Sequence, residues 1–268
     1  MPRVNRQFEG AKEMVGQVAD VDALNIMIYS IWAKQLHNNH PLPGFVSSIK
    51  KNTLLILGSN PSFNPDGYEK ELSQSKYQDI RELGHPNKFR DFMFQFDLAP
   101  LQDRNEVLEL VSKVCRIDES IGDNGHVYSH RLNKFGIEPT GLNIQQVVWW
   151  DMCFLRMNDQ TNLDVFLKSN PKLKWTMLLI ALRVIEMQEP KMILLPNSGA
   201  VRNLQSVLKL FGGSLEFSQT YGTHVLTMGK ISCPIFLSSN LHSRNQLDAY
   251  SKERYKWHVG WVWEKLNG

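Results

Sequence analysis

Cysteine is scarce in this sequence of 268 residues. The chain holds three cysteines, which lie far apart and form no CxxC pair: Cys115, Cys153 and Cys233. A disulfide framework is therefore excluded, and so is a cluster held by four thiolates of this chain. The simplest compartment for such a chain is a reducing one, so we expect a cytoplasmic, intracellular protein.

Long apolar runs are also missing. No stretch approaches the roughly 18 apolar residues that a helix needs to cross a bilayer. The first residues, MPRVNRQFEGAKEM, lack the apolar core of a secretory signal. We therefore expect no membrane partner and no secretion. Repeats, low-complexity tracts and long Pro/Gly/Ser linkers are absent too, so we expect one domain over residues 1–268.

The third absence is an excess of charge of one sign. The chain has 30 Lys and Arg against 27 Asp and Glu, a net charge of +3. This balance permits a nucleic-acid partner without requiring one. With 42% hydrophobic and 21% charged residues, the composition is typical of a globular chain and unlike that of a disordered one.

Short apolar runs alternate with longer segments of helical periodicity. Four runs without polar alternation are typical of strands covered on both faces: 53–57, 147–152, 191–195 and 235–238. Five segments show the apolar spacing of helices: 20–37, 105–116, 173–188, 199–210 and 249–266. This alternation predicts an α/β fold, a three-layer α/β/α sandwich with a central, mostly parallel sheet of about four strands.

Two segments fit this scheme less directly. Residues 224–228 and 231–239 predict either a hairpin across Gly229 and Lys230 or two edges of the sheet. Residues 66–140 mix helical stretches with polar turns, and we interpret them as a long excursion over the ends of the strands. In open parallel sheets the ligand binds at the carboxyl ends of the strands, so the loops there are the candidates for function.

The loop after the first predicted strand reads GSNPSFN at residues 58–64. Gly58 permits close backbone approach, the Asn60-Pro61 pair forces a defined turn, and Ser62 could expose backbone N–H groups to an anion. The loop fits neither the Walker pattern nor GxGxxG, so nucleotide phosphates are not specifically indicated. A turn chosen only for its shape explains the same residues.

The loop after the last predicted strand is rich in polar side chains. It reads SSNLHSRN at residues 238–245. His242 could donate a hydrogen bond to a developing anion, and Arg244 could reach a phosphate. A solvated loop that caps the following helix is the alternative.

Together the two loops resemble the motifs of the uracil-DNA glycosylase superfamily. GSNPS at residues 58–62 is similar to the first motif, in the GxNPG-type branches that carry Asn where other branches carry Asp. HSRN at residues 242–245 is similar to a degenerate second motif, His-Pro-Ser-Pro and its variants, without the first proline. VVWWDMCFLR falls where the family has its central base-reading strand, and KMILLPNSGA where it has the next strand.

The resemblance implies an enzyme that flips a base out of the stack and hydrolyses its N-glycosidic bond. Asn60 would orient the attacking water, and His242 would donate to the carbonyl oxygen of the departing base. Phe63 would stack on the base, with Phe89 or Phe92 as alternatives. DNA would be the partner of a monomeric, monofunctional enzyme that uses no metal and no organic cofactor.

The resemblance also implies which residues surround the base and the DNA. The base would contact Gly58, Ser59, Ser62, Phe63 and Asp151. Four residues of the last loop would contact DNA: Ser239, Ser243, Arg244 and Asn245.

Asp151 stands where uracil-specific branches carry an Asn that reads the base. An amide both donates and accepts, whereas an ionised carboxylate only accepts. Asp151 is therefore protonated, or the base presents donors to it, or its side chain points into the scaffold. Uracil, deaminated purines and other modified bases all remain candidate substrates.

Other functions fit parts of the sequence. A glycosylase-like domain could bind nucleic acid or nucleotide without cleaving it, and an unrelated α/β hydrolase could act on a small nucleoside or nucleotide. His126 and His130 have the spacing of two metal ligands on a helix, but no third ligand stands beside them. Residues 254–266 mix basic and aromatic side chains, and predict either a nucleic-acid surface or, with Trp257, Trp261 and Val262 at helical spacing, a helix packed on the sheet.

Overall fold

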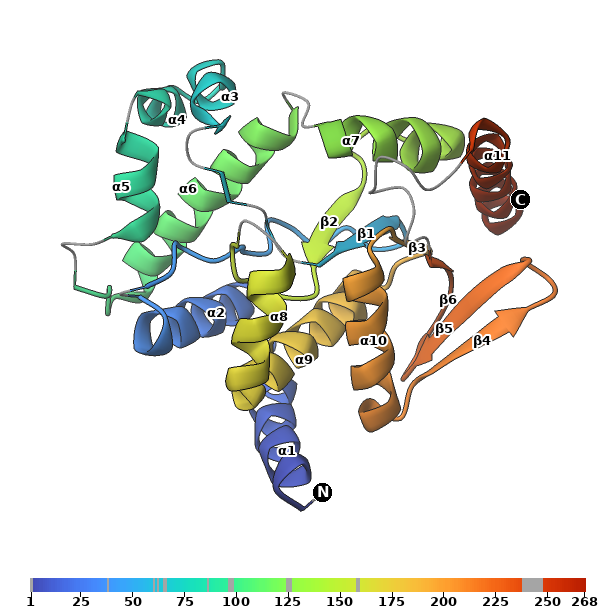
Figure 1. The fold of residues 1–268 in the computed structure, drawn as a ribbon, viewed down its shortest axis with the longest axis horizontal. Coiled ribbons are helices and arrows are strands. Elements are labelled where there is room, and N and C mark those ends of the chain that lie inside the picture. Colours follow the sequence, from blue (N-terminus) through green and yellow to red (C-terminus); the bar gives the residue numbers. More distant parts are fainter. Residues whose placement is uncertain are drawn as a thin grey trace.

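The computed structural model describes most of the chain as an α/β fold (Figure 1). The described residues are 2–37, 39–59, 61, 63–64, 67–85, 87–95, 99–123, 127–157, 160–237 and 248–268. Within these residues, no helix is both long enough and apolar enough to cross a membrane.

Within the described residues, helices flank six strands. The strands are β1 (Leu54–Gly58), β2 (Val148–Asp151), β3 (Met192–Leu195), β4 (Ser214–Ser218), β5 (Thr223–Met228) and β6 (Ile231–Leu237). The α-helices are α1 (Pro2–Gly16), α2 (Val21–Gln35), α3 (Glu69–Ser73), α4 (Gln78–Arg81), α5 (Lys88–Phe94), α6 (Arg104–Asp123), α7 (Val127–Leu132), α8 (Gln160–Ser169), α9 (Pro171–Gln188), α10 (Ser198–Phe211) and α11 (Ala249–Asn267). Three shorter helical turns are η2 (Glu82–Gly84), η3 (Asn133–Ile137) and η4 (Glu138–Thr140).

The strands form one mixed sheet in the order β2-β1-β3-β6-β5-β4. The first four are parallel, and β5 and β4 continue the sheet as antiparallel strands. The prediction of about four strands was therefore too low. It missed β4, whose sequence SLEFS is polar and only partly buried, because β4 is the far edge strand of the sheet.

The hairpin predicted across Gly229 and Lys230 is confirmed. Strands β5 and β6 pair antiparallel with Met228 opposite Ile231. Gly229 has a φ of +58°, a left-handed conformation that glycine adopts without strain.

Strand β2 lies at the opposite edge of the sheet, next to β1. The resemblance placed this strand in the centre, which is wrong for this chain. Val148 and Trp150 are buried on one face of the strand, whereas Trp149 is 36% exposed on the other face. One face of the sheet is therefore only partly covered at this edge strand.

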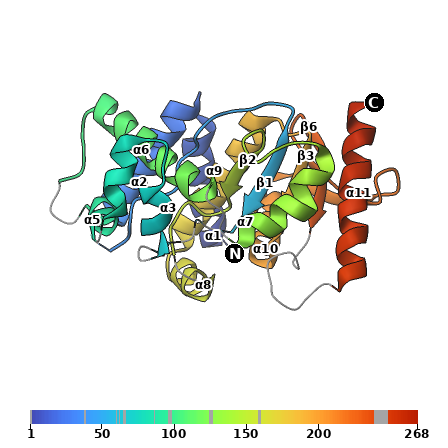
Figure 2. The same ribbon diagram turned by 90° about the horizontal axis from the view of Figure 1, so that it is seen from above.

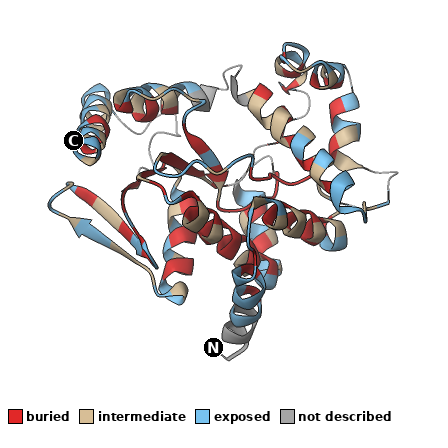
Figure 3. Cartoon of the chain, turned by 180° about the vertical axis from the view of Figure 1, so that it is seen from behind, coloured by how far each residue is buried: buried red, intermediate tan, exposed pale blue. Residues whose placement is uncertain are grey.

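Helices cover both faces of the sheet, and alternate strand residues belong to two separate hydrophobic clusters. Leu55 and Leu57 of β1 pack with α1, α2, α9 and α10 on one face. Leu54 and Ile56 pack with α11 and the α7–η4 region on the other. The central strands β1 and β3 are buried over almost their whole length (Figure 3).

The apolar periodicity located the main helices correctly. Helices α2, α6, α9, α10 and α11 each occupy a segment predicted from spacing, although α6 extends seven residues beyond Arg116. Helix α9 begins at Pro171 after Asn170 and ends before Glu189, whose φ of +45° stops the helix. The helix predicted at residues 173–188 and the strand predicted at residues 191–195 are thus both confirmed, and Pro190 lies in the short connection between them.

The excursion at residues 66–140 forms the connection between the neighbouring strands β1 and β2. Helices α3 to α6 gather at one end of the molecule, and α11 stands at the other (Figure 2). Buried residues of the excursion, such as Leu72 and Val114, belong to the same hydrophobic cluster as Leu55 and Leu57. The excursion is therefore packed onto the core that the sheet supports.

Candidate functional site

The first two strands bring two predicted site residues together at the carboxyl edge of the sheet. Strands β1 and β2 are parallel, with Gly58 directly beside Asp151. A Cβ atom placed on Gly58 would collide with the Asp151 carboxylate oxygen Oδ1. Glycine suits this close approach, because its missing side chain leaves the space that the carboxyl group occupies, and any larger residue would force that carboxyl to move.

The chain after each of these strands continues alongside the other. The Met152 N–H donates to the Gly58 carbonyl at 3.0 Å, and the Cys153 N–H to the Ser59 carbonyl at 3.0 Å. Ser59 is buried at this junction, with 5% of its surface exposed. The loops that follow β1 and β2 thus form one joined backbone unit, as their predicted placement at a shared edge requires.

Burial dominates the electrostatics of Asp151. Burial of the Asp151 carboxyl raises its pKa to about 7, and the carboxylate of Asp118 adds to the rise. The cation of Arg156 acts in the opposite direction. Near neutral pH this carboxyl group therefore exists both as an acid that can donate a hydrogen bond and as a carboxylate that only accepts.

Arg156 is the functional-site neighbour that the sequence reasoning missed. Its side chain is 3% exposed, and its guanidinium donates to Asp118 Oδ2 at 2.6 Å and to the Leu42 carbonyl at 3.0 Å. The signal in the sequence was an arginine inside the apolar run MCFLRM directly after β2. A charge in such a run is seldom buried without a partner.

Phe63 lies in an aromatic cluster formed with the excursion. Its ring is 6% exposed and lies 5.8 Å from the ring of Phe89 and 5.6 Å from that of Phe94. Phe92, the other alternative, lies under the ammonium of Lys113 at 4.9 Å. Phe63 thus packs in the core beside the first loop, and its stacking on a base stays a prediction.

All of the residues predicted for catalysis and DNA contact, and one of those predicted to contact the base, lie outside the described part of the chain. These are Asn60, Ser62, Ser239, His242, Ser243, Arg244 and Asn245. Their roles, and the convergence of Asn60 with His242, stay predictions.

The same holds for a metal site at His126 and His130, because His126 lies outside the described residues. Elsewhere in the described chain, no three His, Cys, Asp or Glu side chains group as metal ligands would. Burial raises the pKa of the Cys115 and Cys153 thiols to about 12 in each case, so neither is a thiolate at neutral pH.

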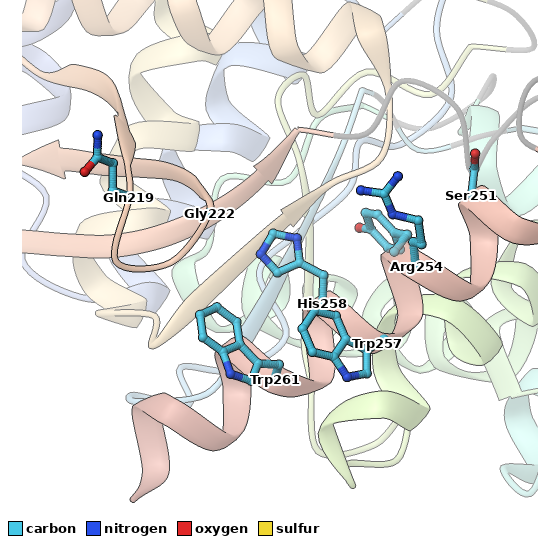
Figure 4. A pocket seen from close by; sticks show the side chains of 8 residues that line it. Gln219, Gly222, Ser251, Arg254, Trp257, His258 and Trp261 are labelled. Carbon is cyan, nitrogen blue, oxygen red and sulfur yellow. The ribbon is translucent and has the colours of Figure 1, made fainter.

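A surface cavity of about 480 Å³ lies between α11 and the β4–β5 turn (Figure 4). It is lined by Gln219, Gly222, Ser251, Arg254, Tyr255, Trp257, His258 and Trp261. A second cavity lies between α1 and α9. Neither is lined by Gly58, Ser59, Phe63 or Asp151.

The C-terminal helix corrects one sequence interpretation. The prediction grouped Trp257, Trp261 and Val262 on the face packed against the sheet. Val262 is buried there together with Val259, but Trp257 is 68% exposed and Trp261 is 36% exposed. Residues four apart share a helix face, so the two tryptophans lie together on the outer side and only Val262 packs inward.

No protein-family model matches this chain, and no curated protein matches it.

Proposed function

We propose that the chain is a monofunctional DNA-base glycosylase that hydrolyses the N-glycosidic bond of a flipped uracil or other deaminated base. Bond cleavage separates a cationic sugar from an anionic base. Catalysis then requires a positioned water at the sugar and a hydrogen-bond donor at the base. In this proposal Asn60 orients the water, and His242 donates to the base.

The observation that best supports the proposal is the pairing of Gly58 with Asp151. It joins the first-motif loop to the strand that the family uses to read the base, at the ligand-binding edge of a parallel sheet. With its pKa raised to about 7, a protonated Asp151 carboxyl can donate to a base carbonyl and accept from a ring N–H. That donor and acceptor pair matches the edge of uracil, and hypoxanthine offers the same carbonyl and N–H.

The test uses DNA duplexes that carry uracil, hypoxanthine or xanthine at one position. The full chain is incubated with each, and abasic sites are then cleaved with alkali. We expect strand breaks from at least one of these bases, and a loss of about 100-fold or more in single-turnover rate in His242→Ala. Asn60→Ala should slow the same reaction.

His130→Ala is the matched control, because His130 is an exposed histidine of α7. It should release base at the parent rate. Absence of breaks from all three bases, or breaks that persist unchanged in His242→Ala, would refute the proposed reaction and roles.

The second candidate function is binding of nucleic acid without cleavage. The exposed tryptophans of α11 favour it, because stacking surfaces of this kind bind strands without any chemistry. Salt-dependent binding to DNA with no breaks from any base would support this alternative over the glycosylase.

A further inference from the structure

Helix α11 has two contrasting faces. On its inner face Val259, Gly260 and Val262 are buried, and a Cβ atom on Gly260 would lie 2.9 Å from the Pro139 carbonyl oxygen. On its outer face five exposed residues recur at intervals of four, three, four and four: Tyr250, Arg254, Trp257, Trp261 and Lys265. We call these five residues the α11 stripe. Since the inner face already anchors the helix, the stripe is free for another contact.

The stripe exposes an unusual amount of aromatic surface. Tyr250 is 72% exposed and Trp257 is 68% exposed. The rings of Trp257 and Trp261 are stacked, with centroids 6.1 Å apart and planes within 11° of parallel. Both side chains project from the same side of the helix (Figure 4). Large exposed aromatic groups that gather on one face mark interaction surfaces.

Cations hold positions beside the rings. The Arg254 guanidinium lies 5.7 Å from the Tyr250 ring centroid, and Lys265 Nζ lies 5.1 Å from that of Trp261. Lys265 also donates to the Thr220 carbonyl at 3.0 Å, which holds its ammonium group at the β4–β5 turn. The helix carries four Lys and Arg against two Glu, so its charge complements an anion.

The turn and the helix form a pre-shaped cavity beside the stripe. His258 Nε2 lies 2.7 Å from the Tyr221 carbonyl, and because a carbonyl only accepts, Nε2 carries the hydrogen in this contact. Gly222 has a φ of +63°, and a Cβ atom there would lie 3.2 Å from His258 Nε2. Glycine thus lets the turn approach the histidine closely. The resulting volume of about 480 Å³ is within the usual range for ligand sites.

We infer that the α11 stripe binds a single strand of nucleic acid, with bases stacked on Trp257 and Trp261 and phosphates held by Arg254 and Lys265. Along the stripe a cation lies on either side of the Trp257 and Trp261 ring pair, so that stacked bases would have their phosphates beside Arg254 and Lys265. Ser251 and Gln219 give the adjoining cavity a polar wall. A polar wall suits a nucleic-acid strand better than it suits a lipid surface. None of these residues belongs to the proposed catalytic site, so the inference extends beyond that function.

The topology puts this surface near the same edge of the sheet as Gly58 and Asp151. Because β5 runs antiparallel to β6, the β4–β5 turn lies beside the carboxyl end of β6 at Leu237. Strands β3 and β6 are parallel to β1, so the carboxyl ends of β1 and β2 lie on this same side of the sheet. Strand β5 is three positions from β1, roughly 15 Å at the usual spacing. The turn that borders the cavity therefore lies at the same end of the parallel strands as the proposed site.

The test measures binding of the full chain to a fluorescein-labelled strand of about 15 thymidines by fluorescence anisotropy. We expect Trp257→Ala and Trp261→Ala each to weaken binding about ten-fold, while Trp257→Phe keeps most of the affinity. Arg254→Gln and Lys265→Gln should each lower the slope of log affinity against log salt by about 0.7. Phe217→Ala is the matched control, because Phe217 is 62% exposed on β4 and lies outside the cavity.

Several results would overturn the inference. One is a double variant Trp257→Ala/Trp261→Ala that binds the strand within about two-fold of the parent. Another is a loss of strand affinity in Phe217→Ala as large as the loss in the tryptophan variants. A third is a parent chain that does not bind the strand, but binds phosphatidylserine vesicles or self-associates through the same tryptophans. Thermal melting followed by circular dichroism checks that each variant is folded.

The binding readout is separate from base excision. A thymidine strand offers no deaminated base, so binding is measured whether or not the chain is a glycosylase. Strand binding that depends on the tryptophans, together with no base release from any duplex, would support the stripe and refute the glycosylase. Base release, together with strand binding that the tryptophan variants do not change, would support the glycosylase and refute the stripe.

Discussion

At the scale of single residues, the contact between Gly58 and Asp151 joins the end of β1 to the end of β2. The sequence showed a glycine at a strand end, which is a common feature of turns. The structure shows a more specific need, since the Asp151 carboxyl occupies the place of a side chain on residue 58. The two positions should therefore behave as a coupled pair.

We expect Gly58→Ala to lower the free energy of unfolding by about 1–3 kcal/mol, because the new methyl group overlaps the carboxyl. Adding Asp151→Ala should recover much of that loss, so that the two changes are strongly non-additive. Urea denaturation of both single variants and the double variant measures the coupling. Gly10→Ala is the control, since a Cβ atom there meets no other atom within 4 Å and alanine favours a helix. Additive effects would show that the contact is unimportant.

The raised pKa of Asp151 predicts a pH dependence of stability. The folded chain keeps this proton up to about pH 7, whereas the unfolded chain loses it near the ordinary value of 3.8. Between these values the folded state binds more protons, so the free energy of unfolding falls as pH rises. The fall attributable to Asp151 is at most about 4 kcal/mol, at about 1.4 kcal/mol per pH unit.

Asp151→Asn removes the titrating group, so it should remove this part of the decrease in the free energy of unfolding as pH rises. Chemical denaturation of the parent and the variant between pH 4 and pH 8 measures the difference, which should grow in favour of the variant as pH rises. A constant difference across this interval would mean that Asp151 ionises normally in the folded protein.

At the scale of elements, an ion pair between a buried arginine and a partly exposed aspartate ties three separate segments together. Arg156 follows β2, Asp118 belongs to α6, and Leu42 precedes β1. The excursion between β1 and β2 is thus held to the strand that it leads into. A buried charge that loses its partner is costly, so this tie should contribute much more to stability than a surface pair does.

We expect Asp118→Ala to destabilise the chain by about 3 kcal/mol or more, because it leaves the Arg156 guanidinium buried with one partner fewer. The matched control is Asp164→Ala. Asp164 faces Arg202 at 3.9 Å in a pair with both side chains about half exposed, and its removal should change stability by less than about 1 kcal/mol. Thermal unfolding of both variants makes the comparison. Equal effects would mean that the Arg156 pair is no stronger than a surface pair.

Helix α11 shows where periodicity succeeds and where it stops. The spacing of apolar residues located the helix correctly, because a helix turns about 100° per residue whatever it packs against. The assignment of its faces went wrong at Trp257 and Trp261, since tryptophan was counted as an inward residue. Which of two apolar stripes is buried depends on the neighbours, here Pro139 and the sheet.

At the scale of the whole molecule, the alternation of apolar runs was sufficient to predict an α/β sheet with helices. It was insufficient for the strand order. Strand β1 ends at Gly58 and β2 begins at Val148, so their pairing spans the whole excursion, and no local pattern records which distant strand will be the neighbour. The edge position of β2 and the added strand β4 were therefore unpredictable from their own residues.

The local features of this protein were settled by its sequence: the buried strands, the segments that form the main helices, the glycine at position 58 and the acid at position 151. These depend on neighbours along the chain, where backbone geometry and side-chain size act directly. Only the tertiary structure decided that Asp151 lies over Gly58, that Arg156 is paired in the interior and that two tryptophans face outward. Those outcomes depend on burial and on contacts between distant segments, which exist only once the chain is packed.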